Sequence, residues 1–65
     1  MILDVYKIKC IMANQQISQK ELADKMGIMA NTISLTFKRK SATTTFVGKL
    51  ANALSTTVEE ITVKE

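Results

Sequence analysis

Side chains able to take part in catalysis are scarce in this chain. It has no histidine and one cysteine, Cys10, so the usual zinc signatures cannot be assembled. Glu21 and Asp24 lie three residues apart, a spacing at which an acid and a base could pair on one helix, but they more simply cap and solvate that helix. Cys10 falls in an apolar stripe, where a lone thiol is typical of a small core residue. We therefore expect no enzyme activity, no cofactor and no metal.

Positive charge is the second chemical feature of the chain. Nine lysines and arginines against six acidic residues give a net charge of +3. Between residues 27 and 54 every charged residue is basic, and these residues are Lys38, Arg39, Lys40 and Lys49. A surface with charge of one sign is what binding to phosphate groups requires, although a solvated basic loop is the alternative interpretation.

The segment SQKELADKMGIMANTISL, residues 18–35, contains the elements that would position such a surface. Ser18 and Glu21 form an S-x-x-E capping box, which marks a helix start. Apolar residues then follow at helical spacing, and Gly27 fits a helix C-cap in the left-handed conformation. After a short link, Ile33 restarts a helical pattern. This arrangement is typical of a helix-turn-helix, whose second helix enters the major groove of DNA.

The apolar periodicity of the whole chain predicts an all-α protein. We expect a single domain over residues 1–65, with the helix-turn-helix at about residues 18–37. The expected helices cover residues 3–13, residues 19–26, residues 30–37, a fourth stretch ending near residue 54, and a short final turn around residues 58–61.

Threonines mark the starts of the last two helices. Thr43 or Thr44 is the expected cap of the fourth helix, and Thr57 with Glu60 forms a second capping box. The tail, residues 62–65, is too short to assign, but its alternating apolar and polar residues fit an extended strand.

The cellular setting follows from the composition. The lone cysteine and the lack of a secretory pattern indicate a reducing, cytoplasmic environment. No apolar run approaches the roughly 18 residues that a membrane span needs, so we expect neither a membrane nor a small-molecule ligand as a partner.

Two stretches of the sequence resemble a known family. QISQKELADKMGIMANTIS is similar to the Q-x-E-L-A-x-x-x-G signature, with I-S starting six residues after the glycine, of the Cro/XRE helix-turn-helix family of phage repressors and Cro proteins. LANALSTTVEEI is similar to the junction between the fourth and fifth helices of that family. The resemblance extends from about Ile8 to Ile61.

The resemblance implies a compact five-helix, lambda-repressor-like DNA-binding domain. Such a domain acts as a homodimer on a double-stranded DNA operator with two-fold symmetry, and it regulates transcription by occupying promoter DNA. The short chain is closer to Cro, or to a bare repressor domain, than to a regulator with a separate sensor. Because antitoxins and anti-repressors share the fold, a protein-binding module is the alternative function.

The resemblance also implies roles for individual positions. The residues expected to contact base edges are Ala30, Asn31, Thr32 and Leu35. Those expected to contact DNA phosphates are Gln19, Ser34, Lys38, Arg39 and Lys40. The residues expected at the dimer interface are Val58, Ile61 and Val63, with closure of the monomer core as the alternative role for this group.

The sequence departs from the family pattern at both ends of the expected recognition helix. Met29 stands where a small polar cap is usual, and the loss of such a cap costs about 1 kcal/mol unless Asn31 or another group compensates. Met29 would then touch a thymine methyl or pack against the turn. Phe37 replaces a common glutamate, and Arg39 replaces the usual glycine. These departures predict a loop of different shape after the recognition helix.

The base-reading positions predict the type of operator. Ala30 and Leu35 cannot form hydrogen bonds, whereas the amide of Asn31 can form a bidentate contact, most naturally with N6 and N7 of adenine. We therefore expect a site rich in A·T pairs, in which Ala30 and Leu35 contact thymine methyl groups.

Overall fold

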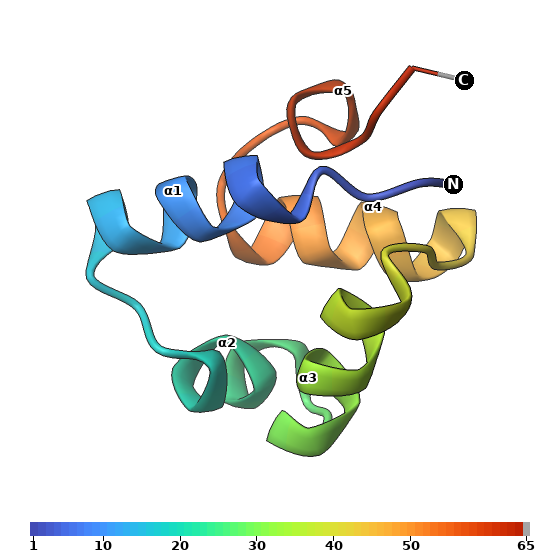
Figure 1. Ribbon diagram of the computed structural model, residues 1–65. Coiled ribbons are helices and arrows are strands. Elements are labelled where there is room, and N and C mark those ends of the chain that lie inside the picture. Colours follow the sequence, from blue (N-terminus) through green and yellow to red (C-terminus); the bar gives the residue numbers. More distant parts are fainter. Residues whose placement is uncertain (65) are drawn as a thin grey trace.

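Five short helices joined by brief connections make up the fold of the computed structural model, which describes residues 1–64 (Figure 1). The helices are α1 (Val5–Gln15), α2 (Gln19–Met26), α3 (Ala30–Arg39), α4 (Thr44–Ala53) and α5 (Val58–Ile61). Helices α2 and α3 lie on the side of the molecule opposite α5. The prediction of an all-α, five-helix domain is confirmed.

The core takes apolar side chains from every helix. The side chains with no exposed surface at all are Ile8, Leu22, Ile33, Val47, Leu50, Leu54 and Ile61. No polar or charged residue within residues 1–64 is buried, so burial of apolar surface is the main source of stability.

Cys10 does not belong to this core, contrary to the prediction. The residue is exposed on α1, because Ile8 and Met12 provide the buried stripe of that helix. Cys10 instead lies one helical turn after the exposed Tyr6. The neighbouring Cys10 raises the pKa of Tyr6 above its ordinary value, through a side-chain hydrogen bond and through electrostatic interaction.

Helix α1 begins and ends two residues later than expected. Asp4 is its N-cap, and the Asp4 carboxylate accepts a hydrogen bond from the backbone N–H of Lys7 at 3.1 Å. Leu3 therefore lies outside the helix, in an extended segment. At the other end, Gln15 is still helical and its side chain donates to the backbone carbonyl of Leu54. Gln16 then ends the helix in the left-handed conformation, with φ of 55°.

The two predicted capping boxes differ in outcome. At Ser18 both halves form: the Ser18 hydroxyl accepts from the Glu21 N–H, and the Glu21 carboxylate accepts from the Ser18 N–H, each at 3.1 Å. At Thr57 only one of the two hydrogen bonds forms: the Thr57 hydroxyl accepts from the Glu60 N–H at 3.4 Å. The carboxylate of Glu60 instead accepts from the hydroxyl of Thr56 at 2.7 Å, because that donor is within its reach. The N-cap of α4 is Thr43, which is one of the two threonines expected there.

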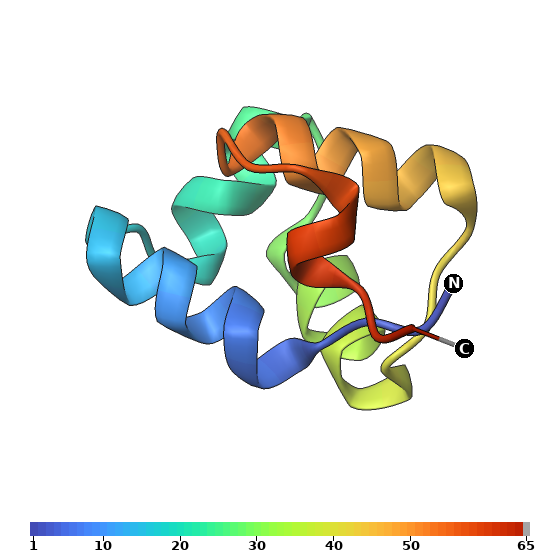
Figure 2. The same ribbon diagram turned by 90° about the horizontal axis from the view of Figure 1, so that it is seen from above.

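The two ends of the described chain lie beside each other in extended conformation (Figure 2). Ile2 forms an isolated antiparallel bridge with Ser41, and Leu3 forms one with Thr62. The tail at Thr62 is therefore extended, the conformation that the alternating pattern suggested. Within residues 1–64, no helix is long and apolar enough to cross a membrane.

Candidate nucleic-acid interface

The turn between α2 and α3 is built by a glycine. Gly27 has φ of +69°, a conformation that other L-residues adopt only with strain. Its N–H donates to the carbonyl of Asp24 at 3.2 Å, and the next N–H, of Ile28, donates to Ala23 at 3.0 Å, so the last carbonyls of α2 are satisfied. Ala23 is 1% exposed. A small buried residue at this position allows α3 to pack closely on α2.

The inward face of α3 is fixed by two core residues, Ile33 and Phe37, which are 0% and 5% exposed. Because these residues are four apart, they orient the helix so that the remaining positions face solvent. The exposed positions are Ala30, Asn31, Thr32, Leu35, Lys38, Arg39 and the cap residue Lys40. All four expected base-reading residues and all three expected basic contacts therefore lie on accessible surface.

The remaining expected phosphate contacts are more enclosed. Gln19 is half-buried in the first turn of α2, and Ser34 is half-buried on α3. The hydroxyl of Thr36 donates to the carbonyl of Thr32 at 2.8 Å, so Thr36 is tied to its own helix. Asn31 and Leu35 are one helical turn apart and share a face of α3.

The start of α3 lacks a side-chain cap, as the sequence predicted. Met29 occupies the N-cap position with an extended backbone and no side-chain capping hydrogen bond. The N–H of Thr32 donates to the Met29 carbonyl at 3.0 Å. Since no side chain caps the start of α3, the Asn31 side chain has no capping role. Met29 is 73% exposed, so most of its side chain is accessible to solvent.

The end of α3 carries the basic cluster, which we define as Lys38, Arg39 and Lys40. All three residues are exposed, and positive charge at a helix C-terminus is favoured by the helix dipole. The helix runs two residues past its expected end at Phe37, and the left-handed residue is Lys40, with φ of 59° and its N–H bonded to Thr36. The left-handed turn therefore falls one residue after the position where the family usually has glycine.

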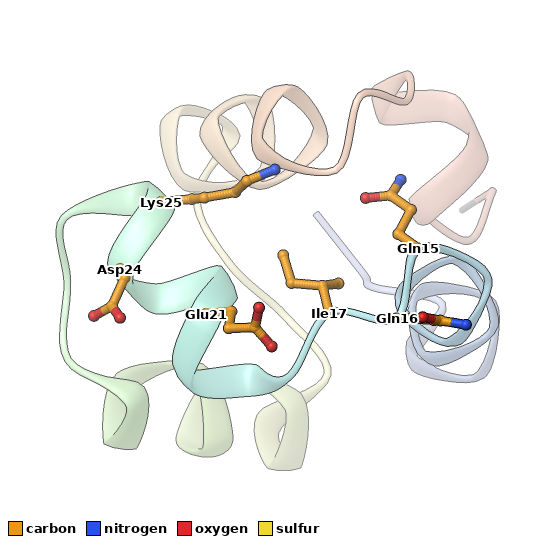
Figure 3. Close-up of a pocket in the computed structure, with 6 residues that line it drawn as sticks. All are labelled: Gln15, Gln16, Ile17, Glu21, Asp24 and Lys25. Carbon is orange, nitrogen blue, oxygen red and sulfur yellow. The ribbon is translucent and has the colours of Figure 1, made fainter.

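The hollow between the end of α1 and α2 does not form an acid–base site (Figure 3). It has a volume of about 340 Å³ and is lined by Gln15, Gln16, Ile17, Glu21, Asp24 and Lys25. The carboxylates of Glu21 and Asp24 point in different directions, and Glu21 is held in its capping box. Glu21 caps the helix and Asp24 is exposed on it, which agrees with the simpler of the two interpretations that the sequence allowed.

The comparison with known families agrees with this geometry. A family model described as a Cro/C1-type HTH DNA-binding domain matches residues 7–64. The chain belongs to this family. No curated protein and no solved structure matches it.

Helices α2 and α3 have the arrangement of a helix-turn-helix, a motif whose second helix is the one that enters the major groove. The resemblance stated from the sequence is thus confirmed at the level of the family and of DNA binding. Helix α1, which carries the exposed Tyr6 and Cys10, lies above α2 and α3 in Figure 1.

The expected dimer residues divide into two kinds. Ile61 has no exposed surface, so it closes the monomer core and is not available to a partner, and its assignment to the interface is corrected. Val58 is half-buried and Val63 is 48% exposed. Both can contribute to a contact between subunits.

No pattern in the sequence indicated the contacts made by residues 1–3. Leu3 was expected inside the first helix, whereas its N–H donates to the carbonyl of Lys40 at 2.8 Å. The acidic residue at position 4, a favoured N-cap type, was the available signal for the later helix start.

Proposed function

We propose that this Cro/C1-type domain is a transcriptional repressor of phage type, which binds a two-fold-symmetric operator as a dimer and places α3 of each subunit in the major groove. The observation that carries the proposal is the outward face of α3, which combines an exposed Asn31 near its start with the basic cluster at its end. One helix thus offers a side chain that can read a base and, at its end, charges that can bind the phosphate backbone.

Base recognition rests on Asn31. Its amide is exposed and has no capping role, so both its donor and its acceptor are available to N7 and N6 of adenine. Ala30 and Leu35 offer apolar surface to thymine methyl groups, and Thr32 lies beside them. The proposed half-site is therefore rich in A·T pairs.

Phosphate recognition rests on the basic cluster, with Gln19 and Ser34 as polar contacts. Lysine and arginine that neutralise phosphates release counterions, so binding weakens steeply with salt. Every charged residue within residues 27–54 is basic, and this positive charge favours approach to DNA.

A dimer follows from the symmetry of such operators. Two recognition helices read half-sites separated by about one helical turn, roughly 34 Å. Val58 and Val63 are the proposed contact residues, because they retain accessible apolar surface near the end of the described chain.

One observation favours the alternative of a protein-binding module. Met29 is 73% exposed and Leu35 is 46% exposed, and apolar side chains gathered on an accessible surface also suit a protein partner. An antitoxin or anti-repressor would use this same face of α3 to hold a protein.

The test is a gel shift against random duplex DNA, followed by selection of bound sequences from a library. Asn31→Ala and Arg39→Ala are the variants. Asn14→Ala and Lys9→Ala are matched controls, because they remove the same kinds of side chain from exposed positions on α1. We expect the first pair to weaken binding and the second pair to leave it unchanged. If neither Asn31→Ala nor Arg39→Ala alters binding, or if the selected half-site has only G·C pairs, this proposal is wrong.

A further inference from the structure

The C-terminal end of α3 is held by the first three residues of the chain. The N–H of Leu3 donates to the carbonyl of Lys40 at 2.8 Å, and the N–H of Ala42 donates to the carbonyl of Met1 at 3.0 Å. The amino group of Met1 also donates to the carbonyl of Ala42 at 2.8 Å. Residues 1–3 therefore pair with residues 40–42 of the link between α3 and α4.

The other edge of this segment is paired as well. The N–H of Asp4 donates to the carbonyl of Ile61, and the N–H of Val63 donates to the carbonyl of Ile2, both at 2.9 Å. The side chain of Leu3 is 2% exposed and anchors the segment in the core. Residues 1–3 are thus the middle one of three extended segments that are joined by isolated bridges, and Figure 2 shows both chain ends beside the link.

The link needs this support for two reasons. Helix α3 packs mainly against α2, and Phe37 is the last of its side chains in the core, so the basic cluster lies beyond the packed part of the helix. In addition, Lys40 holds a left-handed conformation that costs a non-glycine residue energy. Such a conformation persists where the surroundings impose it, and here the hydrogen bond from Leu3 lies on the carbonyl of Lys40 itself.

We propose that residues 1–3 are a positioning strand of the DNA-binding surface: they fix the link after α3 so that the basic cluster meets the phosphate backbone. The inference rests on the proposed DNA-binding function and adds a residue set that touches no DNA. Loosening the strand lets the three side chains spread over many directions, so that at least one of them no longer neutralises a phosphate.

The test is the substitution Ala42→Pro, which removes the N–H that donates to Met1. Ser41, the preceding residue, lies in a bridge and already has the extended backbone that proline requires before it. The matched control is Thr44→Pro. Thr44 is the first residue of α4, a position that suits proline because its N–H has no partner within the helix.

The readout is the slope of the logarithm of the DNA-binding constant against the logarithm of salt concentration. Each neutralised phosphate contributes about 0.9 to this slope, so one lost contact makes it about 0.9 shallower and weakens binding about eightfold at about 0.1 M salt. We expect at least this change for Ala42→Pro, and a slope equal to that of the original protein for Thr44→Pro. A destabilised but correctly positioned surface would keep the slope.

The outcomes separate the two proposals. If the original protein binds no DNA, or binds with no salt dependence, the proposed function fails. If it binds with a steep slope and Ala42→Pro has that same slope, or if Thr44→Pro loses as much as Ala42→Pro, the positioning strand is refuted while DNA binding stands.

A second measurement on the unaltered protein decides the matter if Ala42→Pro does not fold. Addition of duplex DNA should slow hydrogen exchange at the amides of Leu3 and Ala42 by a larger factor than at the amide of Ile8 in α1, because the contacts of the basic cluster order the link. Equal slowing at all three amides would be a general effect of ligand binding and would overturn the proposal.

Discussion

The uncapped start of α3 predicts that Met29→Ser stabilises the protein. Met29 has the backbone of an N-cap, with φ of −80° and ψ of 143°, but its side chain makes no capping hydrogen bond. Serine at such a position accepts a hydrogen bond from an N–H of the first turn. Met29→Ala is the matched variant, because it removes the same side chain and adds no cap.

The magnitude follows from two terms. The hydroxyl of a serine cap is worth about 1 kcal/mol relative to alanine. Met29 is 73% exposed, and full burial of a methionine side chain is worth about 1.5–3 kcal/mol, so removal of its buried quarter costs about 0.5 kcal/mol. Met29→Ser should therefore gain about 0.5 kcal/mol over the original protein, and Met29→Ala should lose a similar amount.

Thermal unfolding followed by circular dichroism measures this difference. A change of 1 kcal/mol corresponds to about 4–8 °C in a domain of this size, so the Tm of Met29→Ser should exceed that of Met29→Ala by about that margin. Equal Tm values for the two variants would refute the reasoning, since they differ at this site by the capping hydroxyl alone.

Three other changes test separate parts of the account. Leu50→Ala removes a side chain with no exposed surface, so urea denaturation should show a loss of about 2–5 kcal/mol, and a loss below 1 kcal/mol would place Leu50 outside the core. Cys10→Ala should lower the pKa of Tyr6, because it removes the hydrogen bond and the electrostatic interaction that raise it. An ultraviolet titration reports this directly, since the chain has one tyrosine and no tryptophan, and an unchanged titration would show that the two groups do not interact. Lys40→Gly relieves the left-handed conformation of Lys40 and should raise stability by about 0.5–1 kcal/mol while it weakens DNA binding; a variant that is both less stable and unchanged in DNA affinity would contradict both roles of Lys40.

Local signals in the sequence were sufficient for most of the helices. The capping box at Ser18 and the left-handed cap at Gly27 act within a few residues of chain, so the bounds of α2 were predicted as the structure has them. The exposed face of α3 could be predicted for the same reason, because burial of Ile33 and Phe37 fixes the rotation of the helix.

Contacts between distant residues were the part that the sequence could not supply. Leu3 fits the apolar stripe of α1, but two backbone hydrogen bonds set its position. One joins Leu3 to Lys40, and the other joins the next residue, Asp4, to Ile61. No local pattern encodes such pairs. Cys10 was expected in the core because it lies within the helix that carries the core stripe. Its position around the helix axis differs from that of Ile8 and Met12, so its side chain is exposed. For Ile61, an apolar residue near a chain end fits either a core or an interface, and the complete burial of its side chain in the monomer decides for the core.

The central claim is that the exposed face of α3, from Asn31 to the basic cluster, is the surface that binds DNA. The most direct test is an NMR titration of the labelled protein with duplex DNA, in which the backbone amide shifts of residues 1–64 are followed. The account predicts that the largest changes lie in α3, at the first turn of α2 and in the link to α4, and that the outer face of α1 around Tyr6 stays unchanged. Changes centred on α1, or no changes at DNA concentrations that saturate a gel shift, would contradict it.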